Sequence, residues 1–377
     1  MNDTQTSSVI IDNGSESLKL GHAGDQAPRE VVQTVFGQSR FPELDVALER
    51  LDYFVGDEAV KKRGLLDLHF PIKNRRIVDF EKMEKVWHHS IFEVLKVDPA
   101  QHSFLLTESP EYTDSDRESI AEIFFEFFGI PSMYIANQGC LGLYSTGQTR
   151  GVVLDSGEGG THVIPVYEGY VSPYSLGHSA VSGKAITEYL QRLLVGKGLT
   201  FSTVHDSRVV KDIKESKCYV SLDFEKELQE FQEKANTRDI LYELPDGQKI
   251  NLNCEQIEAT EALFTPRLIN SNSLGLGELI YKSYFAIDTE VHNALFERIV
   301  LCGGNMLFPN ISERICKNIK ALEGTSINFK VYEQAERKYS TWIGGSILAC
   351  LSPFETIWIS QKEYEETGPA IVNRKRF

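Results

Sequence analysis

The chain has 377 residues, of which 25% are charged and 41% hydrophobic, and its formal net charge is -15; this composition is typical of a globular protein with two or three structural units. The acidic balance argues against sequence-independent binding to nucleic acid, and no apolar run reaches the roughly 20 residues of a membrane span. Residues 1–8 are polar, so we expect no signal peptide there. The six cysteines include no CxxC pair, which favours reduced thiols over a zinc site.

Strand-like and helix-like segments alternate along the chain, which predicts an α/β fold. Ser115 and Glu118 fit a capping box for a helix at 120–128, and Gly129 fits the stop of that helix. In chain order we expect a strand at 9–12, a helix at 79–97, a strand at 103–107, the helix at 120–128, a short helix at 137–144, strands at 151–155 and 161–167, a helix at 207–220, a strand at 299–301 and a helix at 311–322.

Two of these strands run into near copies of one short motif. Residues 10–14 read IIDNG and residues 153–157 read VLDSG. Each copy is an apolar strand followed by Asp, a small polar residue and Gly. The repeat therefore suggests two related halves, each with its own strand and turn.

Glycine-containing turns after strands can bind phosphate. Glycine allows a tight turn, and several successive N–H groups form an anion nest. Gly14 with Ser15, and the segment 157–159, are expected to form two such nests, one in each half. Lys19 lies just beyond the first nest, where its charge can neutralise a phosphate.

The aspartates of the repeat, Asp12 and Asp155, place carboxylates beside those phosphates. Two negative groups next to a polyphosphate make sense when a cation lies between them. Mg²⁺ fits, because it keeps several waters and binds substrate phosphates with few protein carboxylates. The alternative is that each aspartate caps its own hairpin turn.

Other polar residues have both a functional and a structural interpretation. Gly303 and Gly304 follow a third strand and either approach a nucleotide or form a plain strand–helix turn. Gln138 can orient a water and His162 can relay its proton, although both can also be structural. Lys214 and Glu215 lie on the predicted helix at 207–220. They too have a functional interpretation, and the structural alternative is that they form a solvated face of that helix.

With these residues in place, the chain resembles the actin family over nearly its whole length. Besides the two turns, the resemblance includes residues 55–59 (VGDEA), 83–89 (MEKVWHH), 105–108 (LLTE), 165–170 (PVYEGY), 212–215 (DIKE), 242–247 (YELPDG), 336–339 (ERKY), 342–347 (WIGGSI) and 372–377. It implies an actin-like ATPase fold, with two ribonuclease-H-like α/β halves around a nucleotide cleft. The expected halves are 1–145 with 341–377, carrying a small subdomain at about 34–70, and 146–340, carrying one at about 184–268.

The resemblance also implies ligands and site residues, namely ATP or ADP with Mg²⁺ or Ca²⁺. Asp12 and Asp155 match cation positions, reached through water, and Gln138 and His162 match the residues that position the attacking water. The phosphate positions match Asp12, Gly14, Ser15, Lys19, Asp155, Gly157, Glu158 and Gly159, where Glu158 replaces the usual Asp. Ribose and adenine positions match Gly183, Lys214, Glu215, Gly304, Asn305, Leu307, Phe308 and Lys338, with Asn305, Leu307 and Phe308 in place of Thr, Met and Tyr.

Departures from the family pattern gather at polymer contacts and the phosphate exit. Residues 38–52 replace a glycine-rich contact loop, and residues 268–274 are more polar than the usual apolar plug. Asn74 and His178 stand where the family has a histidine and a gate arginine, and Ala180, Lys184 and Ala185 replace other charged or contact positions. The pattern is that of a divergent actin or an actin-related protein.

The expected function is that of a cytoplasmic, cytoskeletal protein that assembles into filaments and slowly hydrolyses ATP. A non-polymerising subunit of a larger complex is the main alternative, and a small-molecule kinase is a third. The resemblance also implies a groove for partner helices, although plain core packing explains part of that set. The groove positions are Tyr144, Tyr170, Ile343, Ile347, Leu348, Leu351 and Ile357.

Overall fold

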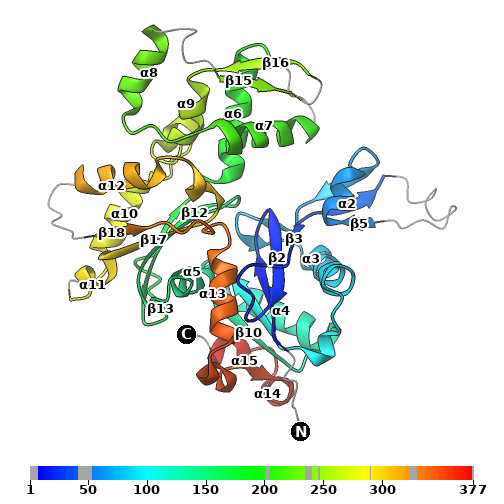
Figure 1. The fold of residues 1–377 in the computed structure, drawn as a ribbon. Helices are drawn as coiled ribbons and strands as arrows, with labels where there is room; N and C mark the ends of the chain where they lie inside the picture. The colour runs from blue at the N-terminus through cyan, green and yellow to red at the C-terminus, as the bar shows by residue number, and fades with distance from the viewer. Residues whose placement is uncertain are drawn as a thin grey trace. The chain divides into compact units, whose positions relative to one another are not determined.

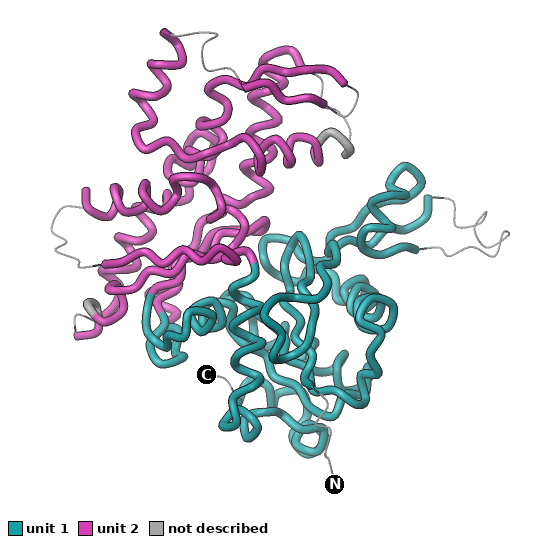
Figure 2. Tube along the Cα trace, in the orientation of Figure 1, with its two compact units in different colours: residues 1–151, 166–171, 339–377 teal, residues 152–165, 172–338 magenta. Residues whose placement is uncertain are grey.

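The computed structural model describes residues 7–40, 53–199, 204–233, 240–244, 247–288, 290–321 and 329–375. The chain divides into two compact units (Figure 2). Unit 1 comprises residues 1–151, 166–171 and 339–377, and unit 2 comprises residues 152–165 and 172–338. Of the divergent segment 38–52, residues 41–52 lie outside the described residues.

The main sheet of unit 1 is mixed. β1 is parallel to β9 and antiparallel to β2, so the first predicted turn closes a hairpin at the centre of the sheet. β9 is also parallel to β10, and the two edge strands are antiparallel to their neighbours. The strand order is β19 (Ile359–Ser360), β10 (Ser132–Asn137), β9 (Phe104–Glu108), β1 (Val9–Asn13), β2 (Ser17–His22) and β3 (Glu30–Gln33).

Alternating side chains of this sheet enter two cores, because successive residues of a strand point to opposite faces. Val9 and Ile11 of β1 join one buried cluster, and Ile10 joins the other. Trp342 of α13 (Ser340–Ala349) covers the Ile10 side, and Figure 1 shows this helix in orange beside the blue strands. Both faces of β1 are therefore buried, which fixes the position of the turn that follows it.

Helices and two small sheets complete unit 1 (Figure 1). The small sheets have the orders β5 (Tyr53–Val55), β4 (Phe36–Ser39), β6 (Leu66–His69), and β7 (Ile72–Lys73), β8 (Arg76–Ile77). The other helices are α2 (Gly56–Lys61), α3 (Phe80–His88), η1 (His89–Leu95), η2 (Pro99–Gln101), α4 (Asp114–Glu122), η3 (Ile123–Phe127), α5 (Gln138–Tyr144), η6 (Ser352–Thr356), α14 (Gln361–Thr367) and α15 (Ile371–Arg374).

The second large sheet repeats the strand order of the first. β17 is parallel to β11 and to β18, as β9 is to β1 and to β10. The order is β13 (Tyr170–Val171), β12 (Thr161–Tyr167), β11 (Arg150–Ser156), β17 (Arg298–Cys302) and β18 (Lys330–Tyr332), and β14 (Gly177–Ser179) pairs with β12. The order β3-β2-β1-β9-β10 thus corresponds to β13-β12-β11-β17-β18, as the repeated motif predicts.

Unit 2 packs its helices around one large hydrophobic core that includes Val152, Leu154 and Leu301 of the sheet. Its two-stranded sheet pairs β15 (Ile240–Glu243) with β16 (Lys249–Leu252). The helices are α6 (Gly183–Gly196), α7 (Val204–Lys217), α8 (Phe224–Glu233), α9 (Glu255–Glu261), η4 (Pro266–Ile269), α10 (Leu276–Phe285), α11 (His292–Phe296), η5 (Gly304–Leu307) and α12 (Ile311–Ala321). Within the described ranges, no helix is long and apolar enough to cross a membrane.

The predicted capping box was wrong. Helix α4 begins two residues earlier than Ser115 and Glu118 imply, at Asp114, with Thr113 as its N-cap. Thr113 Oγ1 accepts a hydrogen bond from the Asp116 amide at 3.2 Å, and the Asp116 carboxylate accepts one from the Thr113 amide at 2.8 Å. Thr113 with Asp116, and Ser115 with Glu118, both fit the capping pattern. Thr113 forms the cap because its backbone is extended, as an N-cap requires, whereas Ser115 lies inside the helix.

The helix predicted at 207–220 is displaced toward the N-terminus. It spans Val204–Lys217, because the chain beyond it bonds to other segments instead of continuing the helix. The amide of Tyr219 donates to the Gln256 carbonyl at 3.3 Å, and that of Val220 donates to the Pro309 carbonyl at 3.0 Å. The helix predicted at 79–97 is α-helical from Phe80 and continues as a π-helix from His89.

Candidate functional site

The first predicted turn joins β1 to β2 and carries an ion pair between a buried aspartate and a partly buried lysine. Asp12 and Lys19 are register partners on these strands, and Lys19 Nζ lies 3.0 Å from Asp12 Oδ2. At Gly14, a Cβ would lie 2.9 Å from Lys19 Nζ and 2.6 Å from the Ser17 carbonyl oxygen. A larger residue at position 14 would therefore displace the lysine, so this turn needs glycine for space.

Asp12 is oriented by groups from several elements. Its Oδ1 accepts a hydrogen bond from Thr107 Oγ1 of β9 at 2.8 Å and one from Gln138 Nε2 of α5 at 3.3 Å. Its other oxygen pairs with Lys19 of β2. A turn cap would be held by amides of its own hairpin, so these contacts favour the functional interpretation of Asp12.

Gln138 lies at the first position of α5, directly after the N-cap Asn137, and only 8% of it is exposed. Its Nε2 also donates to the Asn13 carbonyl at 3.1 Å and to Thr107 Oγ1 at 3.3 Å. Its Oε1 accepts from Arg75 Nη2 at 2.7 Å. The fold thus brings Gln138 to the Asp12 turn, as the functional interpretation requires.

Sequence reasoning missed two residues of this group, Thr107 and Arg75. Thr107 is the second-last residue of β9, the parallel neighbour of β1, and its hydroxyl donates to Asp12 and accepts from the Asn13 amide. The carboxyl ends of parallel strands meet at one sheet edge, so a polar residue ending the predicted strand at 103–107 was the available signal. No local pattern marked Arg75, whose amide donates to Ser15 Oγ at 3.3 Å.

The second turn, in unit 2, follows β11 and is packed against the third glycine turn. Gly303 has a φ of +92°, and a Cβ there would lie 2.3 Å from the Ser156 carbonyl oxygen and 2.8 Å from Asp155 Oδ1. Only glycine fits this conformation and this close approach. Gly303 therefore lets the turn after β17 lie directly on the buried Asp155.

The start of α6 is bonded to the same turn. The Gly183 amide donates to the Gly157 carbonyl at 2.8 Å, and Lys214 Nζ of α7 donates to the Gly183 carbonyl at 2.9 Å. A Cβ on Gly183 would lie 2.6 Å from Glu158 Oε2. Gly159 lies inside the same turn, which closes with a 3.0 Å hydrogen bond from the Gly157 amide to the Gly160 carbonyl.

Burial dominates the electrostatics of this region. It raises the pKa of Glu158, and the positive charge of Lys214 opposes that shift. Burial likewise lowers the pKa of Lys214, which is only 3% exposed. The solvated-face alternative is therefore wrong for Lys214, whereas Glu215 beside it is exposed and lies 3.6 Å from Lys211.

The remaining predicted residues of unit 2 surround the third glycine turn. Asn305 Nδ2 donates at 3.0 Å both to Ser156 Oγ and to the Gly157 carbonyl. Phe308 is buried in the core, and Leu307 at the end of η5 is 41% exposed. Lys338 is close enough to Lys211 to contribute to the lowered pKa of that lysine, about 8, for which burial is the main cause.

His162 lies on β12 and is fully buried. Its ring is 5.1 Å from the ring of His178 on the paired strand β14. His162 belongs to unit 2, whereas Gln138 belongs to unit 1. The two residues predicted to position the attacking water therefore lie in different units.

One comparison with known proteins identifies the family. The family model described as Actin matches residues 3–377 of this chain. The chain belongs to the actin family. Members of this family generally bind a nucleotide and a divalent cation. The glycine turn beside Lys19 and the buried carboxylate of Asp12 fit those two ligands by their chemistry.

The positions predicted to form a partner groove are divided between core and surface. Ile343, Leu348 and Ile357 pack against a buried cluster of unit 1, as does Tyr144. Tyr170, Ile347 and Leu351 are 63%, 41% and 50% exposed. Plain core packing therefore explains the first set, and the exposed set is available to a partner.

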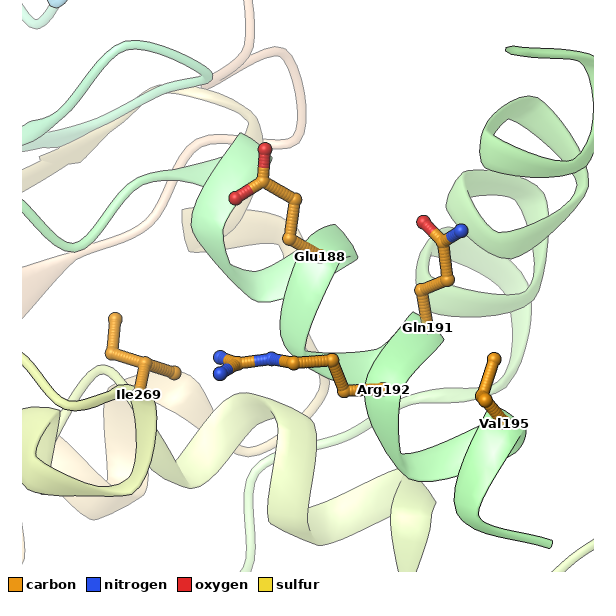
Figure 3. Close-up of a pocket in the computed structure, with 5 residues that line it drawn as sticks. All are labelled: Glu188, Gln191, Arg192, Val195 and Ile269. Carbon is orange, nitrogen blue, oxygen red and sulfur yellow. The ribbon is translucent and has the colours of Figure 1, made fainter. Parts of the chain in front are cut away.

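The polar segment 268–274 bonds to the end of β14 and to the residue that follows it. The Ala180 amide donates to Ser273 Oγ at 3.2 Å, and Ser179 Oγ donates to the Leu274 carbonyl at 3.0 Å. Close by in sequence, a shallow pocket of about 620 Å³ is lined by residues of α6 and η4. Figure 3 shows the Arg192 side chain extending toward Ile269 in it, and the lining residues are Glu188, Gln191, Arg192, Val195 and Ile269. None of the predicted site residues is among them.

Proposed function

We propose that this actin-family protein binds ATP or ADP together with Mg²⁺ or Ca²⁺. The Gly14 and Gly157 turns would bind phosphate through backbone N–H groups, and Lys19 would neutralise phosphate charge. Asp12 and Asp155 would hold the cation through its water ligands. The observation that carries the proposal is the ion pair of the buried Asp12 with Lys19 at a turn that has room only for glycine.

We further propose a slow ATPase. In this reaction a water attacks the terminal phosphorus, the bond to the bridging oxygen breaks, and ADP and phosphate leave. Gln138 would orient that water from the start of α5, and His162 would relay its proton. Such phosphoryl transfer consists mostly of positioning and charge stabilisation, which the turns and Gln138 would supply.

The proposed biological role is that of a cytoplasmic cytoskeletal protein that assembles into filaments, with hydrolysis timing the turnover of the polymer. A non-polymerising actin-related subunit is the second candidate. The polar plug segment, bonded to Ser179 and Ala180 of its own unit, favours that alternative. The exposed side chains Tyr170, Ile347 and Leu351 are proposed to receive a partner helix in either case.

The test combines nucleotide binding, phosphate release and sedimentation of purified protein in Mg-ATP. Helical filaments in the pellet, with phosphate release that follows assembly, are expected. Protein that binds ATP but stays monomeric at every concentration would support the adaptor role.

A matched pair of variants tests the site itself. Asp12→Asn removes the charge proposed to hold the cation and should weaken Mg-ATP binding about tenfold or more. Asp114→Asn, at an aspartate whose side chain is 69% exposed, should leave binding unchanged. Absence of ATP binding by the wild-type protein would refute the proposal.

A further inference from the structure

The hairpin of β7 and β8 has an unusual turn. Lys73 pairs with Arg76, so Asn74 and Arg75 form a two-residue loop, and their φ values are +48° and +64°. Two positive φ values in such a loop are the pattern of a type I′ turn, in which Asn-Gly is the favoured sequence. Arginine at the second position costs free energy that glycine would not. A residue held in this conformation invites a functional explanation.

Both the backbone and the side chain of Arg75 contact the candidate site of unit 1. The Arg75 amide donates to Ser15 Oγ at 3.3 Å, and Nη2 donates to Gln138 Oε1 at 2.7 Å. The hairpin thus bonds to the first glycine turn and to the start of α5. Both contacts depend on the direction in which the positive-φ turn points residue 75.

The hydrogen bonds of Gln138 allow only one orientation of its side-chain amide. Its nitrogen donates to the carbonyl of Asn13 at 3.1 Å, and its oxygen accepts from a guanidinium. A flipped amide would set its oxygen against that carbonyl and its NH₂ group against the Arg75 donors, so both contacts would become repulsive. An amide oxygen has two lone pairs, and the one that Arg75 does not use can accept a hydrogen bond from a water.

We propose that Arg75 is a positioning residue for ATP hydrolysis, which fixes the Gln138 amide with its oxygen ready to orient the attacking water. This inference rests on the proposed function, because it concerns the same reaction. The next residue offers a matched control, since the Arg76 guanidinium donates to Asp116 at 2.8 Å and bonds to α4 instead. Both arginines carry the same charge on the same hairpin.

The experiment compares Arg75→Gln with Arg76→Gln, and adds Arg75→Gly, which suits the turn and therefore should keep the fold. ATP affinity and the single-turnover rate of phosphate release are measured on samples whose assembly is followed by sedimentation. We expect both Arg75 variants to bind ATP within about threefold of wild type but to release phosphate about tenfold more slowly or worse, as for other small misplacements of a catalytic group. Arg76→Gln should match wild type.

Chemical rescue separates positioning from a general structural role. Low millimolar guanidinium chloride should restore part of the rate of Arg75→Gly, whereas the same concentration of sodium chloride should not. A normal rate in Arg75→Gly, or an equal loss in Arg76→Gln, would overturn the role of Arg75 alone. A wild-type protein that binds ATP without ever releasing phosphate would overturn the proposed ATPase, and the Arg75 role with it.

Discussion

Asp12 and Gln138 bond to each other and to the same neighbour, Thr107, and these hydrogen bonds hold both side chains in place. Thr107 Oγ1 bonds to Asp12 and lies 3.3 Å from Gln138 Nε2, which in turn bonds to Asp12. Buried polar groups carry a free-energy penalty unless they find such partners. The same network therefore satisfies buried groups and presents the carboxylate and the amide at one glycine turn.

Gln138→Ala tests the water-positioning role at this scale. The rate of phosphate release should fall about 10²-fold or more, while ATP affinity should stay near the wild-type value because Asp12, Lys19 and the turn remain. Gln101→Ala, at an exposed glutamine of unit 1, is the control. Undiminished phosphate release in Gln138→Ala would exclude the role.

Glu158 provides a pH prediction. Burial raises its pKa in the folded protein above the ordinary value of 4.5, so folding favours the protonated form. The stabilising contribution is present below the unfolded pKa and is lost as pH rises through the folded pKa. In nucleotide-free protein, Glu158→Gln, which mimics the protonated form, should be more stable than wild type near neutral pH.

Urea unfolding across the acid-to-neutral range checks this sign. The stability difference between Glu158→Gln and wild type should shrink as pH falls toward 4.5. Glu225→Gln, at an exposed position of α8, should show no such trend. A variant that is less stable than wild type at neutral pH would contradict the prediction.

At the scale of elements, the boundaries of helices and turns decide which side chains reach the site. Asn137 caps α5 by accepting the Gly139 amide at 2.9 Å, which places Gln138 at the first helical position. In α4, the Thr113 cap likewise places Asp116 inside the first turn, where it pairs with Arg76. Local hydrogen bonds thus set the positions of residues that take part in distant contacts.

The two possible caps of α4 can be compared directly. Thr113→Ala should lower the free energy of unfolding by about 1 kcal/mol, the usual cost of losing an N-cap side chain. Ser115→Ala, at an exposed position inside the helix, should change it by less than about 0.5 kcal/mol. Denaturant unfolding of both variants measures the difference. A larger loss of stability in Ser115→Ala than in Thr113→Ala would instead support Ser115 as the cap.

At the scale of the whole molecule, the two large sheets follow one plan. Each has a central strand that ends in an Asp-containing glycine turn, followed by its hairpin partner on one side and two parallel strands on the other. The buried hydrophobic clusters of unit 1 are separate from that of unit 2.

Removing nucleotide and divalent cation should lower the melting temperature sharply. A ligand present at about 1,000 times its dissociation constant stabilises a protein by about 4 kcal/mol. Calorimetry before and after treatment with a chelator and a nucleotide-degrading enzyme measures the shift, and adding back Mg-ATP should reverse it. An unchanged transition would contradict nucleotide binding by both turns.

The sequence by itself determined the alternation of strands and helices, the two Asp-containing turns and the family, because apolar periodicity and short motifs are local properties of the chain. Only the tertiary structure decided that Thr107 contacts Asp12 and Gln138, that Arg75 contacts Gln138, and that Lys214 is buried. The reason is physical. These outcomes depend on which distant groups packing brings within hydrogen-bonding reach, and no local pattern encodes that distance.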